Sequence, residues 1–384
     1  MHVTRLDIHQ LRRFERARLM PGAGLNVITG DNGAGKTSVL EALHLMAYGR
    51  SFRGRVRDGL VRNGQSALEV FVEWQDRSCV GRDNPMTASP GANGEISARF
   101  RKAGLRHAGH SWEGRLDGQS VAHLGELCAA LAVVTFEPGS HALIAGAGEG
   151  RRRYLDWGLF HVEPGFLPLW RRYSRALKQR NALLKARVTE AQLDAWDREL
   201  AEAGEPLGRH REHYLLALQP GVSRLASELA PTLGEARLAY LPGWRRDELP
   251  LADALLLARQ RDLQSGFTSV GPHRADWRID FSAVPGREAL SRGQAKLTAL
   301  TALLAQAEHH AATCGEWPVL GFDDLASELD RSHQRRLLQW LRDSGAQVFV
   351  TGTEMPPALE ELAAPFSLFH VEHGEVSRVR ERAP

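Results

Sequence analysis

The chain has 384 residues, 43% of them hydrophobic and 25% charged, which is typical of a soluble globular protein with two or more domains. No apolar run approaches the length of a membrane span, and the charged N-terminus lacks the pattern of a signal peptide. The three cysteines are too few and too far apart for a disulfide framework or a metal site, so we expect reduced thiols in a cytoplasmic protein. The net charge of +3 permits a nucleic-acid partner without requiring one.

A phosphate-binding loop is the first motif in the chain. Its pattern, G-x-x-x-x-G-K-[ST], is formed by Gly30, Asp31, Asn32, Gly33, Ala34, Gly35, Lys36 and Thr37. The run 25–29 predicts a strand before the loop and the run 38–48 a helix after it, and the helix N-terminus favours a bound anion. Lys36 is expected to reach the β- and γ-phosphates, and Thr37 to offer its hydroxyl to Mg²⁺. An ordinary glycine-rich turn is the alternative, which this context disfavours.

Further strands are predicted on both sides of the loop. Residues 3–9 and 68–74 mix apolar and polar positions, as half-exposed strands do, and strand-like residues continue at 96–101. Residues 76–94 are rich in Gly, Pro, Ser and Asn and predict a loop. The run 127–136 is apolar but for one threonine, so it is expected to be buried.

Positive charge is concentrated between residues 151 and 187. This segment holds ten Lys or Arg against two acids, a net charge of +8. At helical spacing, Arg171, Arg175 and Lys178 can share a face that differs from the apolar one. A solvated helix face explains such a pattern without any partner.

The middle of the chain carries short apolar stripes at helical spacing, at 193–207 and 222–229. Prolines interrupt the pattern: Pro220, Pro231, Pro242 and Pro250. Because proline breaks helices, a long coiled coil is excluded and a compact helical module of about 120 residues is expected. Residues 277–281 alternate apolar and charged side chains and predict a strand.

A second motif that suits an anion lies near residue 290. Ser291, Gly293 and Gln294 open a helix-like run that extends to residue 312. This arrangement offers a hydroxyl and two or three backbone donors at a helix N-terminus. Taken alone, this motif is only a weak indication of a nucleotide site.

Two adjacent acids, Asp323 and Asp324, come directly after the apolar run 319–322, which predicts a strand. Such a pair can hold Mg²⁺ with one carboxylate and orient a water molecule with the other. A helix cap or a plain loop is the more frequent use of adjacent acids after a strand. Another apolar strand is predicted at 347–351.

The order of these motifs resembles the ATP-binding head of the ABC and SMC class. Four segments are further similar to the RecF family of bacterial recombination mediators: Gly49–Arg53, Gly150–Asp156, Gly271–Asp276 and Asp323–Asp330. The resemblance runs from Val3 to about Val376, so it covers nearly the whole chain. The combination of motifs, spacing and length is far more specific than any single motif.

The resemblance implies an α/β fold, a discontinuous ABC/SMC-type P-loop ATPase head with an inserted mainly helical arm domain. The head is expected at residues 1–160 and 286–384, and the arm at 161–285. The function implied is that of a DNA-binding ATPase of single-strand gap repair, which dimerises with ATP and works with RecR and RecO to load RecA. No membrane partner is implied.

The same resemblance implies roles for single residues. Lys36, Thr37 and Asp323 are expected to bind ATP and Mg²⁺. In such heads a serine-glycine-glutamine motif completes the ATP site of the other protomer of a homodimer, and the matching residues here are Ser291, Gly293 and Gln294.

Asp324 stands where related heads often have glutamate, so a shorter carboxylate must reach the attacking water. Residues 351–353 occupy the stretch where transporter heads place a switch histidine, which this chain lacks there. Because proton transfer depends on hydrogen-bond reach, slow hydrolysis that acts as a timer is expected. Glu137 lies near the place of the usual lobe-connecting glutamine.

Beside an ATP-dependent dimer, the basic segment is expected to track DNA phosphates without reading sequence. The candidate DNA contacts are Arg50, Arg53, Arg151, Arg152, Arg171, Arg175 and Lys178. His273 and Arg274 are either functional residues or loop anchors.

The rival interpretation of the whole protein is an SMC-like head that clamps or tethers DNA and uses ATP as a conformational ligand. A transporter ATPase subunit is a second rival, disfavoured by the missing switch histidine.

Overall fold

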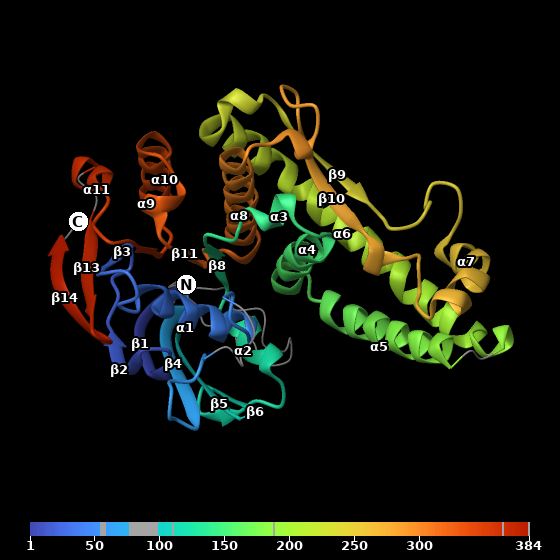
Figure 1. Cartoon of the computed structure of the whole chain (residues 1–384), viewed down its shortest axis with the longest axis horizontal. Coiled ribbons are helices and arrows are strands. Elements are labelled where there is room, and N and C mark those ends of the chain that lie inside the picture. Colours follow the sequence, from blue (N-terminus) through green and yellow to red (C-terminus); the bar gives the residue numbers. More distant parts are fainter. Residues whose placement is uncertain (54–58, 77–98, 110, 187–188, 363–364, 383–384) are drawn as a thin grey trace, which may run out of the picture. The chain divides into compact units, whose positions relative to one another are not determined.

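The computed structural model describes residues 1–53, 59–76, 99–109, 111–186, 189–362 and 365–382 (Figure 1). By compactness it divides into two units, Met1–Ser140 with His310–Pro384, and His141–His309. This division rests on compactness and does not test the predicted boundaries between head (1–160 and 286–384) and arm (161–285), which stay a prediction. The loop predicted at 76–94 lies outside the described residues except for Asp76.

A mostly parallel sheet forms one half of the first unit. Its strand order is β14-β13-β3-β12-β11-β8, in which only the edge strand β14 runs antiparallel to its neighbour. The strands are β3 (Leu25–Thr29), β8 (Val133–Phe136), β11 (Val319–Phe322), β12 (Val348–Thr351), β13 (Phe366–Glu372) and β14 (Glu375–Arg382). The strands β3, β11 and β12 are buried along their whole length, which explains their mostly apolar sequence.

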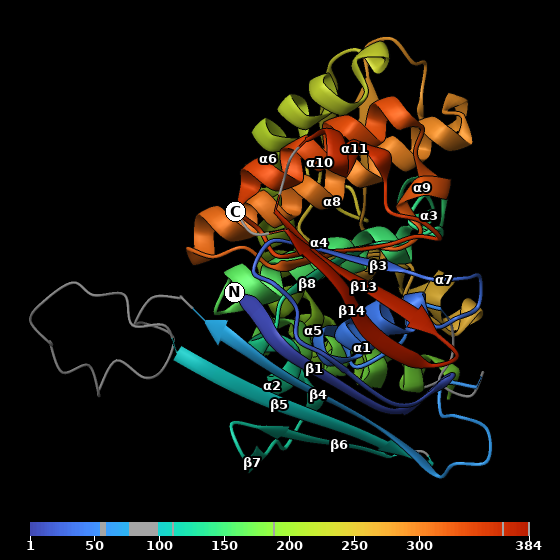
Figure 2. The same cartoon turned by 90° about the vertical axis from the view of Figure 1, so that its left-hand side faces the viewer.

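An antiparallel sheet forms the other half, with the strand order β2-β1-β4-β5-β6-β7. Its strands are β1 (His2–Leu11), β2 (Phe14–Leu19), β4 (Ala67–Asp76), β5 (Arg99–Ala108), β6 (Ser111–Leu116) and β7 (Gln119–Ser120). Figure 2 shows β1, β4, β5 and β6 running alongside one another. In β4 the apolar residues Leu68, Val70, Val72 and Trp74 are buried at alternate positions, as expected for a sheet with one solvated face.

Helices of the first unit are α1 (Lys36–Tyr48), α2 (Leu124–Ala130), α9 (Leu325–Glu328), α10 (Arg331–Ser344) and α11 (Pro357–Glu361). The helix α1 contacts strands of both sheets, and its apolar side chains Val39, Leu43 and Met46 belong to the same buried core as those strands. The core therefore fixes the start of α1, where the phosphate-binding loop ends.

The second unit is mainly helical. Its helices are α3 (Ala142–Ala145), α4 (Gly148–Val162), α5 (Phe166–Lys185), α6 (Asp194–Leu229) and α7 (Leu251–Ser265), and α8 (Arg292–Cys314) begins in it. The antiparallel strands β9 (Ala236–Leu241) and β10 (Asp276–Phe281) form a two-stranded sheet. The strand predicted at 277–281 is confirmed. Among the described residues, no helix combines the length and the apolar character needed to cross a lipid bilayer.

The helix α6 corrects the prediction of short helical stripes separated by proline. It is a single helix of 36 residues with Pro206 and Pro220 inside it. On either side of Pro220, Leu218 and Val222 are buried, so the apolar face continues past the missing N–H donor. Tertiary packing therefore outweighs the local cost of the proline.

Buried ion pairs join the arm helices α5, α6 and α7. The Arg180 guanidinium of α5 is fully buried and pairs with Asp197 at 2.5 Å and Asp262 at 2.7 Å. Arg259 of α7 also pairs with Asp197, at 2.7 Å. A buried charge is costly unless it is paired, and these pairs compensate Arg180 while they link the three helices.

Candidate nucleotide site

The phosphate-binding loop joins β3 to α1, as predicted. Three of its glycines have positive φ angles that other residues rarely adopt, 147° at Gly30, 81° at Gly33 and 126° at Gly35. A Cβ at Gly30 would also lie 2.2 Å from the carbonyl oxygen of Val371. Backbone geometry therefore requires these glycines.

Lys36 begins α1, and its side chain folds back over the loop. Its Nζ donates hydrogen bonds to the carbonyl oxygens of Gly30 at 2.7 Å and Asp31 at 2.9 Å. The lysine is buried, which limits the positions its ammonium can take. A point charge held at this loop is suited to phosphate binding.

Two hydroxyl groups hold the carboxylate of Asp323. Its Oδ1 accepts from Thr37 Oγ1 at 2.9 Å and from Thr351 Oγ1 at 2.7 Å. Burial raises the pKa of the Asp323 carboxyl, while the two hydroxyl donors act in the opposite direction. The strand order explains this meeting, because β3, β12 and β11 are neighbours whose carboxyl ends meet at one edge of the sheet.

Asp324 comes next, with a left-handed backbone at φ 51° and ψ 47°. Its N–H donates to the Thr351 hydroxyl at 2.9 Å, and its Oδ2 accepts from Ser327 Oγ at 2.7 Å. The two adjacent acids therefore face different partners. The Asp323 carboxylate is directed toward Thr37, and the Asp324 carboxylate toward Ser327 in α9.

These residues line one pocket of about 340 Å³ in the first unit. Its lining residues are Arg12, Arg13, Asn32, Gly33, Gly35, Lys36, Thr37, Ser38, Arg53, Asp323, Asp324 and Thr351. Gly30, Asp31 and Ala34 shape the loop without lining the pocket. Four cations and two carboxylates around one pocket suit a polyanion bound together with a divalent cation.

Sequence reasoning did not identify Arg12 and Arg13 as pocket residues. Both lie in the turn between β1 and β2, where Arg12 has a φ of 54°. A Cβ at Gly33 would lie 3.5 Å from Nη2 of Arg13, so this guanidinium lies against the phosphate-binding loop. The sequence signal that could have pointed to this part of the pocket is the pair of adjacent basic residues after the first strand.

A magnesium ion that arrives with a nucleotide needs few protein ligands, because phosphate oxygens and water supply the others. Among the described residues, no three His, Cys, Asp or Glu side chains are grouped to hold a metal ion by themselves. The Thr37 hydroxyl and the Asp323 carboxylate, 2.9 Å apart, fit the few protein ligands that a nucleotide-bound magnesium ion needs.

The serine-glycine-glutamine motif lies in the second unit, at the N-terminus of α8. Ser291 N donates to Gln294 Oε1 at 2.9 Å, and Gln294 N donates to Ser291 Oγ at 3.2 Å. This reciprocal capping fixes the start of the helix. Ser291 and Gly293 are exposed, and a Cβ at Gly293 would meet no atom within 4 Å. The motif is therefore presented on the surface of its own unit.

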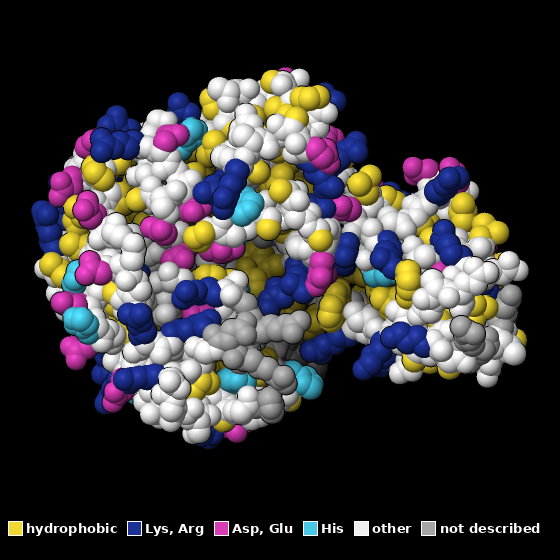
Figure 3. Space-filling view, in the orientation of Figure 1, with side chains coloured by type: hydrophobic (Ala, Val, Ile, Leu, Met, Phe, Trp, Pro, Cys, Tyr) yellow, Lys and Arg dark blue, Asp and Glu magenta, His cyan; other side chains and the backbone are white. Residues whose placement is uncertain are grey.

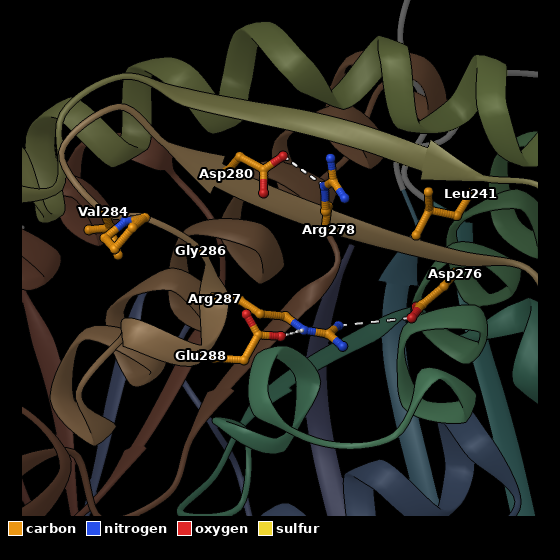
Figure 4. A pocket seen from close by; sticks show the side chains of 9 residues that line it. Leu241, Asp276, Arg278, Asp280, Val284, Gly286, Arg287 and Glu288 are labelled. Atoms are coloured by element: carbon orange, nitrogen blue, oxygen red, sulfur yellow. Dashed lines mark hydrogen bonds and ion pairs between the residues drawn. The ribbon is translucent and has the colours of Figure 1, made fainter.

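The stretch that leads into this motif borders a larger hollow of about 580 Å³ against β10 (Figure 4). Here Arg278 pairs with Asp280 at 2.8 Å, and Arg287 pairs with Glu288 at 3.1 Å. The lining has two arginines against three acids, Asp276, Asp280 and Glu288, so the hollow lacks the excess positive charge that a phosphate ligand requires. Size alone does not identify the nucleotide site.

The basic face predicted on the arm is carried by α5. Arg171, Arg175 and Lys178 are exposed, and Figure 3 shows Lys and Arg side chains over this helix. Arg172 is also exposed but pairs with two glutamates of α6, at 2.7 Å each. Arg187, the last residue of the basic segment, lies outside the described residues.

Arg151 does not face solvent, contrary to its prediction as a DNA contact. Its side chain is 3% exposed and pairs with Asp276, with Nε to Oδ1 at 2.6 Å and Nη2 to Oδ2 at 2.9 Å. Its Nη1 donates to the Gly146 carbonyl at 2.7 Å. Arg151 thus joins α4 to β10 and is unavailable to DNA. Arg152 is half-buried and donates to the Ala275 carbonyl at 2.8 Å.

Arg50 and Arg53 are exposed residues after the C-terminus of α1. Arg53 lines the nucleotide pocket, so its charge faces the predicted phosphate site. The DNA contact of both residues stays a prediction.

His273 lies 2.7 Å from the Tyr173 hydroxyl, and burial lowers its pKa to about 4, which favours the loop-anchor interpretation for this histidine.

Comparisons with known proteins agree with this architecture. A family model described as "RecF/RecN/SMC N terminal domain" matches residues 2–377. The DNA replication and repair protein RecF of Stenotrophomonas maltophilia (strain R551-3) is 65% identical, with 99% of this chain and 100% of that protein covered. This chain belongs to the RecF family. The RecF protein of Pseudomonas aeruginosa (strain LESB58) is 37% identical, with 98% of each chain covered.

Solved structures of the RecF family share the fold. A structure described as the recombination mediator protein RecF with ATP in the RecFOR pathway has a TM-score of 0.83 and 26% identity, covering 99% of this chain and 98% of that one. An SMC head bound to the C-winged helix domain of ScpA has a TM-score of 0.60 at 15% identity, with 99% and 97% covered, and shows likeness of fold alone. The predicted RecF family membership and ABC/SMC-type ATPase head fold are therefore confirmed.

Proposed function

We propose that the pocket binds ATP with Mg²⁺ and that the protein is a DNA-binding ATPase of recombinational repair. The observation that carries the proposal is the contact between Thr37 and Asp323, at 2.9 Å, beside Lys36. Thr37 and Asp323 would hold the ion, which when bound neutralises phosphate charge. The loop and Lys36 would hold the phosphates. The family relative solved with ATP supports the choice of nucleotide.

ATP binding would drive formation of a homodimer, with Ser291, Gly293 and Gln294 of one protomer completing the pocket of the other. In support, Ser291 and Gly293 are exposed at the start of a capped helix, where backbone donors suit a phosphate. A composite site of this kind needs both the phosphate-binding loop and the serine-glycine-glutamine motif. In this chain the loop lies in the first compact unit and the motif in the second.

Hydrolysis would be slow and stimulated by DNA, with Asp324 orienting the attacking water. In support, the Asp324 carboxylate lines the pocket but accepts a hydrogen bond from Ser327 at 2.7 Å, and an aspartate has a short reach. ATP would then act as a timer for pairing rather than as fuel for a motor.

The DNA interface would be the exposed basic face of α5, formed by Arg171, Arg175 and Lys178. Because it contacts phosphates alone, binding would be independent of sequence and would weaken steeply with salt. Duplex and gapped DNA are both proposed as ligands of this face. RecO and RecR are proposed as partners in a cytoplasmic setting, since the solved relatives are described within the RecFOR pathway.

The proposal is tested by sedimentation of the purified chain with ATP, ADP or no nucleotide, together with fluorescence anisotropy on duplex and gapped DNA. We expect a dimer that forms only with ATP and binds both DNAs more tightly than the monomer. Lys36→Ala is expected to lose both effects. A chain that remains monomeric with ATP would contradict the proposal, and a dimer that never hydrolyses ATP would favour the SMC-like clamp.

A further inference from the structure

Glu41 is a fully buried carboxylate in α1, five residues after Lys36. It accepts hydrogen bonds from Nε of Arg12 at 3.0 Å and from Nη2 of Arg12 at 2.8 Å. It also accepts a hydrogen bond from the Ser51 hydroxyl. A buried carboxylate is tolerated only where charge and hydrogen bonds compensate it, so these three donors hold it in one orientation.

The two partners of Glu41 come from two separate segments, each of which carries a residue that lines the nucleotide pocket. Arg12 lies in the turn between β1 and β2, and its backbone N–H donates to the Leu60 carbonyl at 2.9 Å. Ser51 lies just beyond α1, and its Oγ accepts from the backbone N–H of Arg53 at 2.9 Å. Arg12 and Arg53 both line the pocket that contains Lys36.

We propose that Glu41 is a positioning residue for nucleotide binding. It holds Arg12 directly and the Arg53 segment through Ser51, so both cations are kept beside the phosphates bound by the loop of the same helix. Preorganised charges bind a polyanion without the cost of ordering them on binding. This inference rests on the proposed function, because it assigns ATP as the ligand of the pocket.

A buried ion pair can also serve only to stabilise the fold, and the chain offers a comparison. The Arg180–Asp262 pair is also an ion pair with a fully buried carboxylate, but it lies in the second unit among arm helices. If Glu41 serves only stability, variants of the two networks should behave alike. If it positions pocket residues, changes around Glu41 should weaken ATP binding even at a temperature where the melting curve shows the variant to be folded.

The decisive variants remove the link between Ser51 and Arg53 and leave the Arg12–Glu41 pair intact. Ser51→Ala removes the hydroxyl, and Ser51→Thr keeps it. Arg53→Ala removes the cation that the link positions. We expect Ser51→Ala and Arg53→Ala each to raise the dissociation constant for ATP roughly tenfold, and the double variant to raise it no further, since residues acting as one unit are not additive. Ser51→Thr should restore affinity.

The measurement is the equilibrium dissociation constant of ATP, with the melting temperature of each variant as the test of folding. Arg62→Ala is the matched control, because Arg62 pairs with exposed Glu15 on the surface of the same unit. Glu41→Gln, where it folds, should weaken ATP binding more than Ser51→Ala does.

Independent, multiplying effects of Ser51→Ala and Arg53→Ala would overturn the inference, as would unchanged ATP affinity in Ser51→Ala. If the unaltered chain fails to bind ATP, the proposed function itself fails. If the chain binds ATP, Lys36→Ala abolishes binding and Ser51→Ala has no effect, only the positioning role of Glu41 fails.

Discussion

The Thr351 hydroxyl donates a hydrogen bond of 2.7 Å to the carboxylate of Asp323, on the same oxygen that accepts from Thr37. The same hydroxyl accepts from the backbone N–H of Asp324 at 2.9 Å. Thr351 therefore connects β12 to both acids at the end of β11. These two contacts hold the side chain of Asp323 and the backbone of Asp324 to the neighbouring strand.

Replacing Thr351 by valine should slow ATP hydrolysis while ATP still binds. Losing the hydroxyl leaves Asp323 with one donor fewer and frees the backbone of Asp324, and supporting residues of this kind typically contribute about 10- to 100-fold. Steady-state hydrolysis and the ATP dissociation constant are measured in parallel. Thr351→Ser is the matched control and should retain the wild-type rate. Wild-type hydrolysis by the valine variant would contradict this role.

Asp324→Asn should lower hydrolysis by about 10²-fold or more, because an amide cannot accept a proton from the attacking water. ATP affinity should change little, and the ATP-bound dimer should persist longer in sedimentation. Asp324→Glu tests the argument about reach, since one more methylene brings the carboxylate closer to water. We expect it to hydrolyse ATP at least as fast as the natural protein. Hydrolysis by the asparagine variant at the natural rate would exclude Asp324 from the chemistry.

Changing Arg171, Arg175 and Lys178 together to glutamate should abolish ATP-dependent DNA binding at moderate salt. If these residues neutralise three phosphates, the slope of log affinity against log salt should fall by roughly 3 in the corresponding alanine variant. Arg172→Ala on the same helix should have a smaller effect than any one of the three, because two glutamates already pair with Arg172. Intact DNA binding by the triple variant would refute the α5 interface.

Arg151→Met should destabilise the protein rather than weaken DNA contacts directly. The variant leaves Asp276 without its principal cation, at a cost of about 2–4 kcal/mol, somewhat less than for a fully buried pair because Asp276 is partly exposed. Denaturant unfolding measures this change, and DNA affinity is measured at a temperature where the variant is folded. Lost DNA affinity with unchanged stability would restore Arg151 to the interface.

Stability should decrease as the pH falls below about 6.5, partly because of His44. Burial, helped by nearby Arg50, lowers the pKa of His44 to about 3. Between these values the unfolded chain binds a proton that the folded chain does not, so stability present at neutral pH is lost, by roughly 3 kcal/mol near pH 4.5. His44→Phe should show a shallower loss of unfolding free energy between pH 7 and 4.5. Equal pH dependence in both proteins would exclude His44 as a source.

Sequence was sufficient for the elements around the phosphate-binding loop, because their signals are local. The strand β3 and the helix α1 lie beside a motif whose geometry dictates a strand before it and a helix after it. The helix α6 was predicted as separate pieces, because Pro220 is locally unfavourable and the packing that offsets it involves distant residues. The strand β9 lacks apolar alternation, so only its pairing with β10 reveals it.

The pocket was predictable only in part, for the same reason. Lys36, Thr37 and Asp323 belong to motifs, whereas Arg12 and Arg13 enter the pocket through the folding of the antiparallel sheet. Charge counting also misassigned Arg151, since a basic residue in a basic segment looks exposed until its partner Asp276, far along the chain, is known.

The central claim, that ATP joins the loop of one protomer to the serine-glycine-glutamine motif of another, is tested most directly by crosslinking. Asn32→Cys and Ser291→Cys are placed in separate chains whose native cysteines, Cys79, Cys128 and Cys314, are replaced by serine. The two proteins are mixed and treated with a short thiol crosslinker. We predict a crosslinked dimer with ATP and none with ADP or without nucleotide. No crosslink with ATP, under conditions where both proteins bind it, would contradict the composite site.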